Sequence, residues 1–303
     1  MEPVTLRRYR SDDAAAVTQL FREVYAHHYV QPQVYLPRMI TQNQTDGRWH
    51  SLLAVSADRV VGHAALIRDE GGRTAELALS VVHPDARGRS IATRLGRELL
   101  TQAEAMGYRG VTIKQVTRHP YTQRMAETLG FHGTALFADY APSPVGDPEP
   151  ESVVIGYRPL AGHRRPLPAQ RWPHSSRRLM QHLCDVFGTD HRAEPWVGPA
   201  ARLRLRGDRY DGVFEALDAE LARQLIGLPE RWRISLRLRL GQDFASDLQT
   251  LSQAGFVFCG VTPDDGSNGW LALFHRGVRQ CALTLHCPYM QGLQDDLQRS
   301  ARP

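Results

Sequence analysis

The chain has 303 residues, of which 42% are hydrophobic and 23% charged, proportions typical of a globular protein. This length suits two domains of roughly 150 residues, each large enough to be stable without a metal ion or a disulfide. The formal net charge is +5, but nearly all the basic residues are arginines spread along the chain. Because a surface that follows a phosphate backbone carries a dense basic run or stripe, we expect no nucleic-acid partner.

The four cysteines all lie in the second half without any Cys-x-x-Cys spacing: Cys184, Cys259, Cys281 and Cys287. Scattered thiols of this kind are typical of a reducing compartment, so we expect a cytoplasmic protein. The first residues show no basic region followed by an apolar stretch, and no apolar run approaches the roughly 20 residues that cross a bilayer. We therefore expect no signal peptide and no membrane contact. We also expect no metal, since no cysteine or carboxylate accompanies the histidines at ligand spacing.

The first half predicts an alternation of strands and helices. Alternating or β-branched apolar residues indicate strands at residues 4–9, 52–55, 60–67, 74–82, 111–116, 131–137 and 153–157. Apolar residues at helical spacing indicate helices at residues 11–24, 34–42, 90–106 and 121–129. A glycine follows each of the last two helices, as is common at a helix C-terminus, and prolines mark a connection at residues 142–150.

The second half repeats this order. Residues 161–175, rich in proline and basic residues, have the composition of an interdomain linker. Helices are indicated at residues 175–187, 219–226 and 244–254, and strands at residues 202–206, 212–217, 233–240, 256–261 and 270–274. In both halves a strand leads to a helix, a Gly-Phe pair and two further strands. The pattern predicts a duplicated fold with domains at residues 1–160 and 176–303.

The turn between the strand at residues 74–82 and the next helix has the features of an anion site. The first N–H groups of a helix have no internal partner, and with the helix dipole they attract negative charge. Small and basic side chains alternate along the turn: Arg87, Gly88, Arg89, Ser90, Ile91 and Ala92. Small residues let a pyrophosphate approach the backbone, and arginines bind phosphate oxygens.

The succession of strand, Arg-x-x-Ser-x-Ala turn, amphipathic helix, strand, helix and Gly-Phe resembles the GNAT superfamily of acyl-CoA N-acyltransferases. The resemblance covers residues 4–160 and implies an α/β (α+β) fold, with a mixed, mostly antiparallel central sheet flanked by helices. The family pattern is Arg/Gln-x-x-Gly-x-Gly/Ala, and this chain has Ser90 at the central glycine. Because serine is small and can donate its own hydrogen bond, we expect cofactor binding to survive this departure.

The resemblance also implies how the acyl donor, acetyl-CoA, is held. Backbone N–H groups of residues 87–92 would bind the pyrophosphate of CoA. The strand end at Val81 and Val82 would pair with the pantetheine arm, beside a gap where this strand splays from the strand at residues 111–116. The amine would then attack the thioester directly, with no covalent enzyme intermediate.

The same resemblance suggests catalytic residues. The family often places a carboxylate base on the strand before the turn, and Glu76 takes that position here; an ordinary salt bridge is the alternative. The tyrosine acid that is common four residues before Gly-Phe is replaced by Ala126. His119 and Tyr121, at the start of that helix, are candidates for the missing acid or for CoA contacts. Helix capping and core packing are their alternatives.

Aromatic and histidine side chains gather in the early helical region, which covers the acceptor site in this fold. Tyr25, His28 and Tyr29 are our candidates for contacts with the substrate, since such side chains suit a small-molecule pocket. Packing in the core is the alternative for some of them.

The second half lacks the phosphate turn. Asp218 and Glu220 stand before and within the start of its helix at residues 219–226, where no glycine is present and a pyrophosphate would be repelled. We expect a degenerate GNAT-like domain that does not bind CoA. It would cover the first domain, shape the acceptor site or mediate a homodimer.

The leading hypothesis is an acetyl-CoA-dependent N-acetyltransferase that acts on the amine of a small molecule, such as an amino sugar, an amino acid, or an antibiotic or siderophore intermediate. Two alternatives stay open. A CoA-binding or catalytically inactive sensor is favoured by Ser90 and by the missing tyrosine. A protein or peptide N-acyltransferase would need an open groove instead of a closed pocket.

Overall fold

The computed structural model describes residues 2–68, 71–192, 194–278 and 283–300. The first half holds seven strands: β1 (Thr5–Arg8), β2 (Trp49–Ser56), β3 (Arg59–Arg68), β4 (Thr74–Val82), β5 (Gly110–Val116), β6 (His132–Ala141) and β7 (Glu151–Pro159). Its helices are η1 (Ser11–Asp13), α1 (Ala14–Tyr25), η2 (Pro32–Tyr35), α2 (Pro37–Thr45), η3 (Pro84–Ala86), α3 (Ile91–Ala105) and α4 (Tyr121–Thr128), the three η elements being short 3₁₀ helices. All the strands and long helices predicted for this half are present.

The described residues of the second half form five longer strands and two short ones: β8 (Leu167–Pro168), β9 (Thr189–Asp190), β10 (Ala201–Arg206), β11 (Arg209–Phe214), β12 (Arg233–Arg239), β13 (Val257–Pro263) and β14 (Trp270–Arg276). Its helices are α5 (His174–Phe187), α6 (Ala219–Ile226), α7 (Phe244–Gln253) and α8 (Pro288–Ser300).

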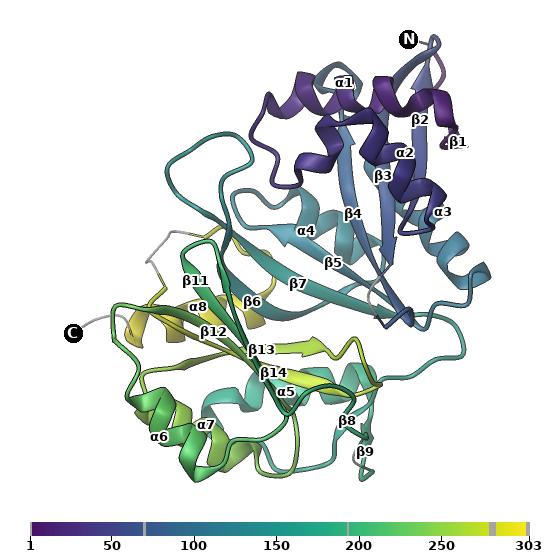
Figure 1. Cartoon of the computed structure of the whole chain (residues 1–303). Coiled ribbons are helices and arrows are strands. Elements are labelled where there is room, and N and C mark those ends of the chain that lie inside the picture. The colour runs from purple at the N-terminus through teal and green to yellow at the C-terminus, as the bar shows by residue number, and fades with distance from the viewer. Residues whose placement is uncertain (1, 69–70, 193, 279–282, 301–303) are drawn as a thin grey trace.

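Among the described residues, one twelve-stranded sheet connects both halves in the order β1-β2-β3-β4-β5-β7-β6-β13-β14-β12-β11-β10 (Figure 1). Within this sheet, neighbouring strands are antiparallel except for β4–β5 and β11–β12, which are parallel. The block β3-β4-β5-β7-β6 therefore recurs in the second half as β10-β11-β12-β14-β13. The two blocks meet where β6 pairs with β13 through Ala135 and Gly260. The mixed, mostly antiparallel sheet is the fold class that the sequence predicted.

Helices cover both faces of the first half of the sheet. On one face the apolar side of α1, with Val17 and Phe21, packs on Leu53 of β2 and Val81 of β4. On the other face Leu95 of α3 packs in a second core that includes residues of β2 to β5. This arrangement follows from the sequence, because the apolar residues of each helix recur at helical spacing.

A third core belongs to both halves. It joins Leu136 of β6 and Tyr157 of β7 to Phe256, Leu273 and Trp270 of the second half. The predicted linker also takes part in it, since Leu167 and Trp172 are buried. The division of the chain into domains at residues 160 and 176 therefore stays a prediction, because the sheet and the core pass through that boundary.

Two elements of the second half differ from the sequence prediction. The strand expected at residues 212–217 lies at Arg209–Phe214, because its first residues, Arg209 and Asp211, are buried as a charged pair that hides the apolar alternation. Helix α8 was not predicted. Its buried side chains Met290 and Leu293 pack in the shared core. No described helix has the length and apolar character needed to span a bilayer.

Candidate active site

β4 and β5 separate halfway along β4. Their parallel pairing runs from Thr74–Gly110 to Leu77–Ile113, whereas β4 continues beside β3 as far as Val82. β5 stays paired with β7 along its whole length. In the described part of the chain, the edge of β4 beyond Leu77 therefore has no neighbouring strand, and its backbone groups can pair with an extended ligand.

A β-bulge accompanies this separation. The β3–β4 register shifts between His63 and Ala65, and Leu79 has a φ of +52°, in the left-handed region that non-glycine residues rarely adopt. The Leu79 carbonyl accepts a 2.8 Å hydrogen bond from His63 Nδ1, and His63 Nε2 lies 3.0 Å from the Ser51 hydroxyl. Burial lowers the pKa of His63 to about 4, so a neutral imidazole holds the bulge.

The bulge also determines how the predicted pantetheine-binding residues lie. Val81 is buried beneath α1, whereas Val82 packs partly against the α3 side of the sheet. The His83 N–H donates to the Val61 carbonyl at 2.9 Å. Since backbone groups alternate along an antiparallel ladder, the N–H and C=O of Val82 point away from β3. Of the two residues, it is Val82 whose backbone faces the side on which β5 has separated.

The predicted phosphate turn follows β4 directly. α3 begins at Ile91, which is buried, and its N-cap Ser90 has φ +54° and ψ +25°. This left-handed conformation is a physical reason for glycine at this place in the family pattern. The first helical hydrogen bond runs from the Arg94 N–H to the Ser90 carbonyl at 2.9 Å. The amides of Ile91 and of the partly buried Ala92 therefore precede it, as unpaired first-turn donors do.

The turn itself is open to solvent. Arg87, Gly88 and Ser90 are exposed, and a Cβ added to Gly88 would meet nothing within 4 Å. The Arg89 guanidinium donates to the Glu2 carbonyl at 2.6 Å, so this side chain is directed toward the N-terminal segment. Of the two predicted arginines, Arg87 is the one left exposed at the turn.

Glu76 and Lys114 form an ion pair at the point where β4 and β5 separate. Glu76 is opposite Thr112 in the parallel register, so Lys114, two residues further along β5, lies on the same face of the sheet. Burial disfavours the charged form of the amine, but the attraction of Glu76 and the contact with Tyr140 outweigh it and raise the pKa of Lys114. Lys114 therefore carries a positive charge next to Glu76.

Tyr140 and Tyr29 lie near this ion pair, and Tyr25 and Tyr35 lie next to Tyr29. The ring centroids of Tyr25 and Tyr29 are 4.9 Å apart, and the Tyr29 N–H donates to the Tyr35 hydroxyl at 3.0 Å. The ring of Tyr140, near the end of β6, has its centroid 5.4 Å from Lys114 Nζ. Burial, reinforced by the neighbouring Tyr25, raises the pKa of Tyr29 well above its ordinary value, so Tyr29 keeps its proton. We call these side chains the Glu76 cluster: Glu76, Lys114, Tyr25, Tyr29, Tyr35 and Tyr140.

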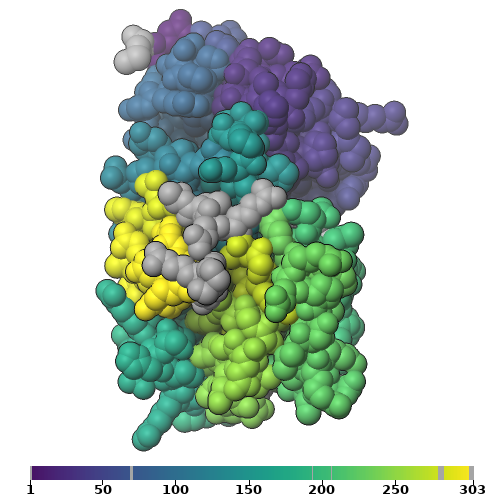
Figure 2. Space-filling model, turned by 90° about the vertical axis from the view of Figure 1, so that its left-hand side faces the viewer, coloured from purple at the N-terminus to yellow at the C-terminus, as the bar shows by residue number. Residues whose placement is uncertain are grey.

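The β6–β7 loop, residues 142–150, closes against the N-terminal helical region. Gly146 has φ +81° and lies so close to His28 that an added Cβ would be 2.9 Å from the imidazole Cε1. In Figure 2 the teal loop lies against the purple N-terminal residues. The structure thus places the predicted substrate residue His28 against this loop.

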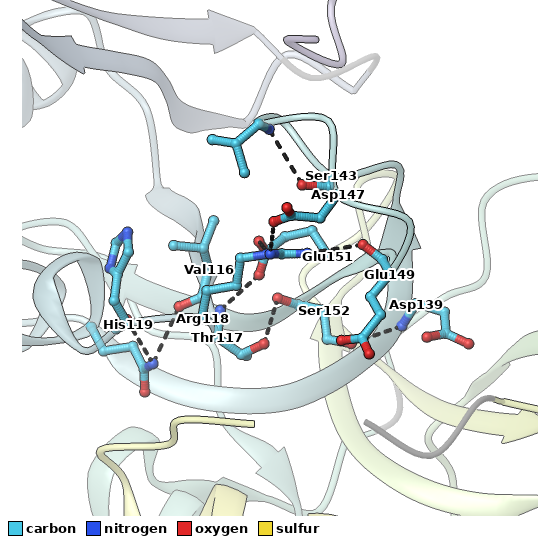
Figure 3. Close-up of polar contacts among 12 residues, drawn as sticks. Val116, Thr117, Arg118, His119, Asp139, Ser143, Asp147, Glu149, Glu151 and Ser152 are labelled. Carbon is cyan, nitrogen blue, oxygen red and sulfur yellow. Dashed lines mark hydrogen bonds and ion pairs between the residues drawn. The ribbon is translucent and has the colours of Figure 1, made fainter. Parts of the chain in front are cut away.

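Arg118 fastens the same loop to the end of β5 (Figure 3). Its guanidinium contacts the Asp147 carboxylate, donates to the Glu149 carbonyl at 2.9 Å and lies 2.9 Å from the Glu151 carboxylate. The buried Glu151 side chain also accepts from the Thr117 N–H at 3.0 Å. One arginine therefore holds two positions of the loop, Asp147 and Glu149, and the first residue of β7, Glu151.

His119 and Tyr121 lie together at the start of α4, with ring centroids 5.0 Å apart. Tyr121 is 71% exposed, and Figure 3 shows His119 pointing away from the Arg118 contacts. Among the described residues, neither ring has a polar or ring contact with the Glu76 cluster. The structure thus brings Glu76 together with Tyr25 and Tyr29 but leaves these two rings at the surface.

Sequence reasoning missed Lys114, Tyr140 and Arg118 as site residues. One signal was available for Lys114, which is the single lysine among 37 basic residues. Tyr140 and Arg118 gave none, because their partners are far away in the sequence and local spacing carries no sign of them. In the part of the chain that the structure describes, no group of three His, Cys, Asp or Glu side chains is placed to hold a metal ion.

A small hollow is present elsewhere, in the second half. It is lined by residues from the end of β12, the β13–β14 loop and the segment around β9, including Arg239, Trp270 and Asp264. None of its lining residues belongs to the turn at residues 87–92 or to the Glu76 cluster, so the chemistry discussed below does not involve it.

A model of the acetyltransferase (GNAT) family matches residues 14–131. These residues, fewer than half of the chain, are similar to the GNAT acetyltransferase family. The GNAT segment includes β4, the turn, α3, β5 and α4, so the resemblance seen in the sequence is confirmed for these elements.

No curated protein matches the chain, but several solved structures are similar to its N-terminal half. An N-acetyltransferase from Staphylococcus aureus Mu50 shares 15% identity over 52% of this chain and 99% of its own, with a TM-score of 0.45. A GNAT superfamily phosphinothricin acetyltransferase from Sinorhizobium meliloti, in complex with AcCoA, shares 19% identity with this chain, and the match has a TM-score of 0.47. It covers 56% of this chain and 94% of the phosphinothricin acetyltransferase chain. A spermidine N-acetyltransferase from Vibrio cholerae shares 15% identity with this chain, and the match has a TM-score of 0.45. It covers 52% of this chain and 94% of the spermidine N-acetyltransferase chain.

Proposed function

We propose that this protein is an acetyl-CoA-dependent N-acetyltransferase that transfers an acetyl group to the amine of a small molecule. The observation that carries the proposal is the gap where β4 leaves β5. The exposed helix start of α3 lies after the end of β4, and the Glu76–Lys114 pair lies where the strands begin to separate. One extended donor molecule can therefore connect the two sites.

The donor is proposed to bind along β4. Of the amides predicted at residues 87–92, that of Arg87 already donates to the Pro84 carbonyl at 3.1 Å. The amides of residues 88–92 and the positive end of α3 would therefore hold the pyrophosphate, and the Arg87 side chain would add charge. The outward-facing N–H and C=O of Val82 would bind the pantetheine arm as a neighbouring strand does. The thioester would then lie close to Glu76.

The acceptor amine must lose a proton before or while it attacks the thioester carbonyl. Glu76 is proposed to accept that proton, directly or through a water molecule, and Lys114 orients its carboxylate. The amine nitrogen forms a bond to the carbonyl carbon, the carbon–sulfur bond breaks, and the thiolate of CoA takes up a proton. Tyr29, which keeps its hydroxyl proton, and the exposed His119 and Tyr121 are the candidate donors of that proton.

The surroundings of Glu76 support a small amine as the acceptor. The tyrosine rings of the Glu76 cluster attract a cationic ammonium group before it is deprotonated, whereas the Glu76 carboxylate is already paired with Lys114. The β6–β7 loop is fastened over this side of the sheet by Arg118 and rests on His28. A fastened loop favours a small molecule over a protein substrate, which would need an open groove.

Release of free CoA thiol from acetyl-CoA, measured against a panel of small amines, tests this proposal. We expect thiol release that depends on one class of amine and on the protein. Stabilisation by CoA without turnover on any amine would favour the sensor instead. A ligand at 100 times its Kd stabilises the folded state by about 2.7 kcal/mol, so thermal unfolding would detect CoA binding separately from turnover.

A further inference from the structure

β6 is distorted next to Tyr140. Asp139 has a φ of +49°, a left-handed conformation that costs a non-glycine residue about 1 kcal/mol or more. The β6–β7 register shifts between Phe137 and Ala141 at the same place. A strained residue persists only where its surroundings hold it. The direction of the Tyr140 side chain therefore depends on what holds Asp139.

Three contacts fix Asp139. Its carboxylate lies 2.6 Å from Arg233 Nη2, and its carbonyl accepts from Arg209 Nη1 at 2.8 Å. The Asp139 N–H donates to the Ser152 hydroxyl at 2.9 Å. Figure 3 shows Ser152 beside Asp139. The side chain, the carbonyl and the amide of Asp139 therefore each have a bonding partner. Such a set of contacts is expected where a bulge is a structural feature and not a defect of the strand.

Two of these three contacts come from the second half of the chain. Arg209 and Arg233 are direct partners in the parallel register of β11 and β12, so they reach Asp139 side by side. Arg209 is buried, is paired with Asp211 at 2.9 Å and lies with its guanidinium carbon 4.6 Å from the centre of the Phe137 ring. A buried charge is costly without its partner, so the two arginines and Asp139 are held as one unit.

We propose that the second half positions the acceptor site of the first, with Arg209 and Arg233 clamping Asp139 so that Tyr140 stays beside Lys114. This rests on the proposed acetyltransferase function and assigns Tyr140 to contact with the amine. Arg209, Arg233 and Asp139 act through Tyr140 and are positioning residues. The second half, which we expect not to bind CoA, would thereby contribute to recognition of the acceptor.

The steady-state kinetics of Arg233→Met test the positioning. We expect the KM for the amine to rise about tenfold, the size of one lost hydrogen bond, while the KM for acetyl-CoA is unchanged. Arg233→Lys, which keeps the charge, should recover much of the loss. Arg239→Met is the matched control on the same strand, because Arg239 contacts Glu194 and Glu215 of the second half, and it should behave like the wild type.

A double variant separates positioning from general destabilisation. Tyr140→Phe should reproduce the rise in KM, and adding Arg233→Met to Tyr140→Phe should cause little further change. If the two substitutions raise the KM for the amine independently, so that their effects multiply in the double variant, the proposal is overturned. If Arg233→Met does not fold, Asp139→Asn replaces it, since the amide keeps the shape of the carboxylate but loses its charge; it should raise the KM for the amine in the same direction.

A crystal structure of Arg233→Met distinguishes failure of this inference from failure of the proposed function. We expect the Tyr140 ring to leave Lys114 in Arg233→Met. A ring that keeps its place would overturn the inference whether or not the protein acetylates any amine. A displaced ring in a protein with no acetyltransferase activity would instead leave the clamp standing and contradict the proposed function.

Discussion

Glu76 and Lys114 show how the site depends on individual residues. The place of Glu76 on the strand before the turn predicts a catalytic base, and the structure gives it a partner that the sequence could not reveal, Lys114. Lys114 reaches Glu76 only because β4 and β5 are parallel and in a particular register. The pair keeps a charged amine and a carboxylate together at the gap, where an acceptor amine would have to lose its proton.

Glu76→Gln should lower the turnover number by about a hundredfold to ten-thousandfold, the usual contribution of a general base. The amide cannot accept a proton from the amine, but it does not disturb the distant phosphate turn, so CoA affinity should stay the same. Thiol release and isothermal titration with CoA measure the two quantities. Glu98→Gln, an exposed change on α3, is the control, and an unaffected turnover number in Glu76→Gln would remove Glu76 from the mechanism.

Lys114→Met should couple strongly to Glu76→Gln. Each single change leaves a half-buried charged group without its partner, whereas the double change leaves neither. Directly interacting residues show coupling energies of roughly 0.5–3 kcal/mol, so urea unfolding of the four proteins should show the double variant to be more stable than the sum of the single losses predicts. Additive losses would indicate that the ion pair contributes nothing to holding β4 against β5.

At the scale of elements, the decisive feature is the end of β4, where the bulge, the gap and the phosphate turn follow one another. The sequence predicted the strand, the turn and the helix, because alternation and helical spacing are local properties. It did not predict the bulge, since Leu79 and Ser80 resemble any other strand residues. The bulge depends on His63, which comes from the neighbouring strand and acts through a single hydrogen bond to a backbone carbonyl.

Ala92→Trp should abolish CoA binding, because an indole ring at the first turn of α3 would occupy the space next to the amides that we propose hold the pyrophosphate. Thermal unfolding with and without CoA measures the effect. Thr101→Trp places the same ring on an exposed position of the same helix and should retain the CoA-induced shift. Normal CoA binding by Ala92→Trp would show that the turn has another role.

Acid should weaken the fold through His63. Its pKa is about 4 in the folded protein and about 6.5 in an unfolded chain, so the unfolded state takes up the proton first. The stability that the neutral ring provides is present above pH 6.5 and is lost as the pH falls toward 4. Between pH 7 and pH 5 this amounts to about 2 kcal/mol.

Urea unfolding at pH 7 and pH 5 tests this linkage. The wild type should lose about 2 kcal/mol more than His63→Gln over that interval, because glutamine can bridge Leu79 and Ser51 but does not titrate. Equal losses in the two proteins would show that the ring is not held neutral at the bulge.

At the scale of the whole molecule, the two halves form one sheet. The repeated order of strand, helix and Gly-Phe predicted two similar blocks, and the strand order repeats accordingly. The sequence could not show that the blocks join edge to edge, since β6 and β13 pair at the single position Ala135–Gly260. Nor could it show that Asp139 binds arginines of the second half, because those contacts span seventy residues or more.

This continuity predicts a single unfolding transition. The shared core includes Leu136 of β6 and Phe274 of β14, so neither half can open without exposing apolar surface of the other. Differential scanning calorimetry should give matching calorimetric and van't Hoff enthalpies. Two resolved transitions would mean that the halves fold independently. The contacts of Arg209 and Arg233 with Asp139 would then contribute little to holding the halves together.

The most direct test of the account is a crystal structure of the protein with CoA. We predict that the pyrophosphate lies within hydrogen-bonding distance of the amides at residues 88–92, the pantetheine arm beside Val82, and the thiol near Glu76 and Lys114. A CoA molecule bound elsewhere, or one whose thiol lies away from the gap between β4 and β5, would contradict it.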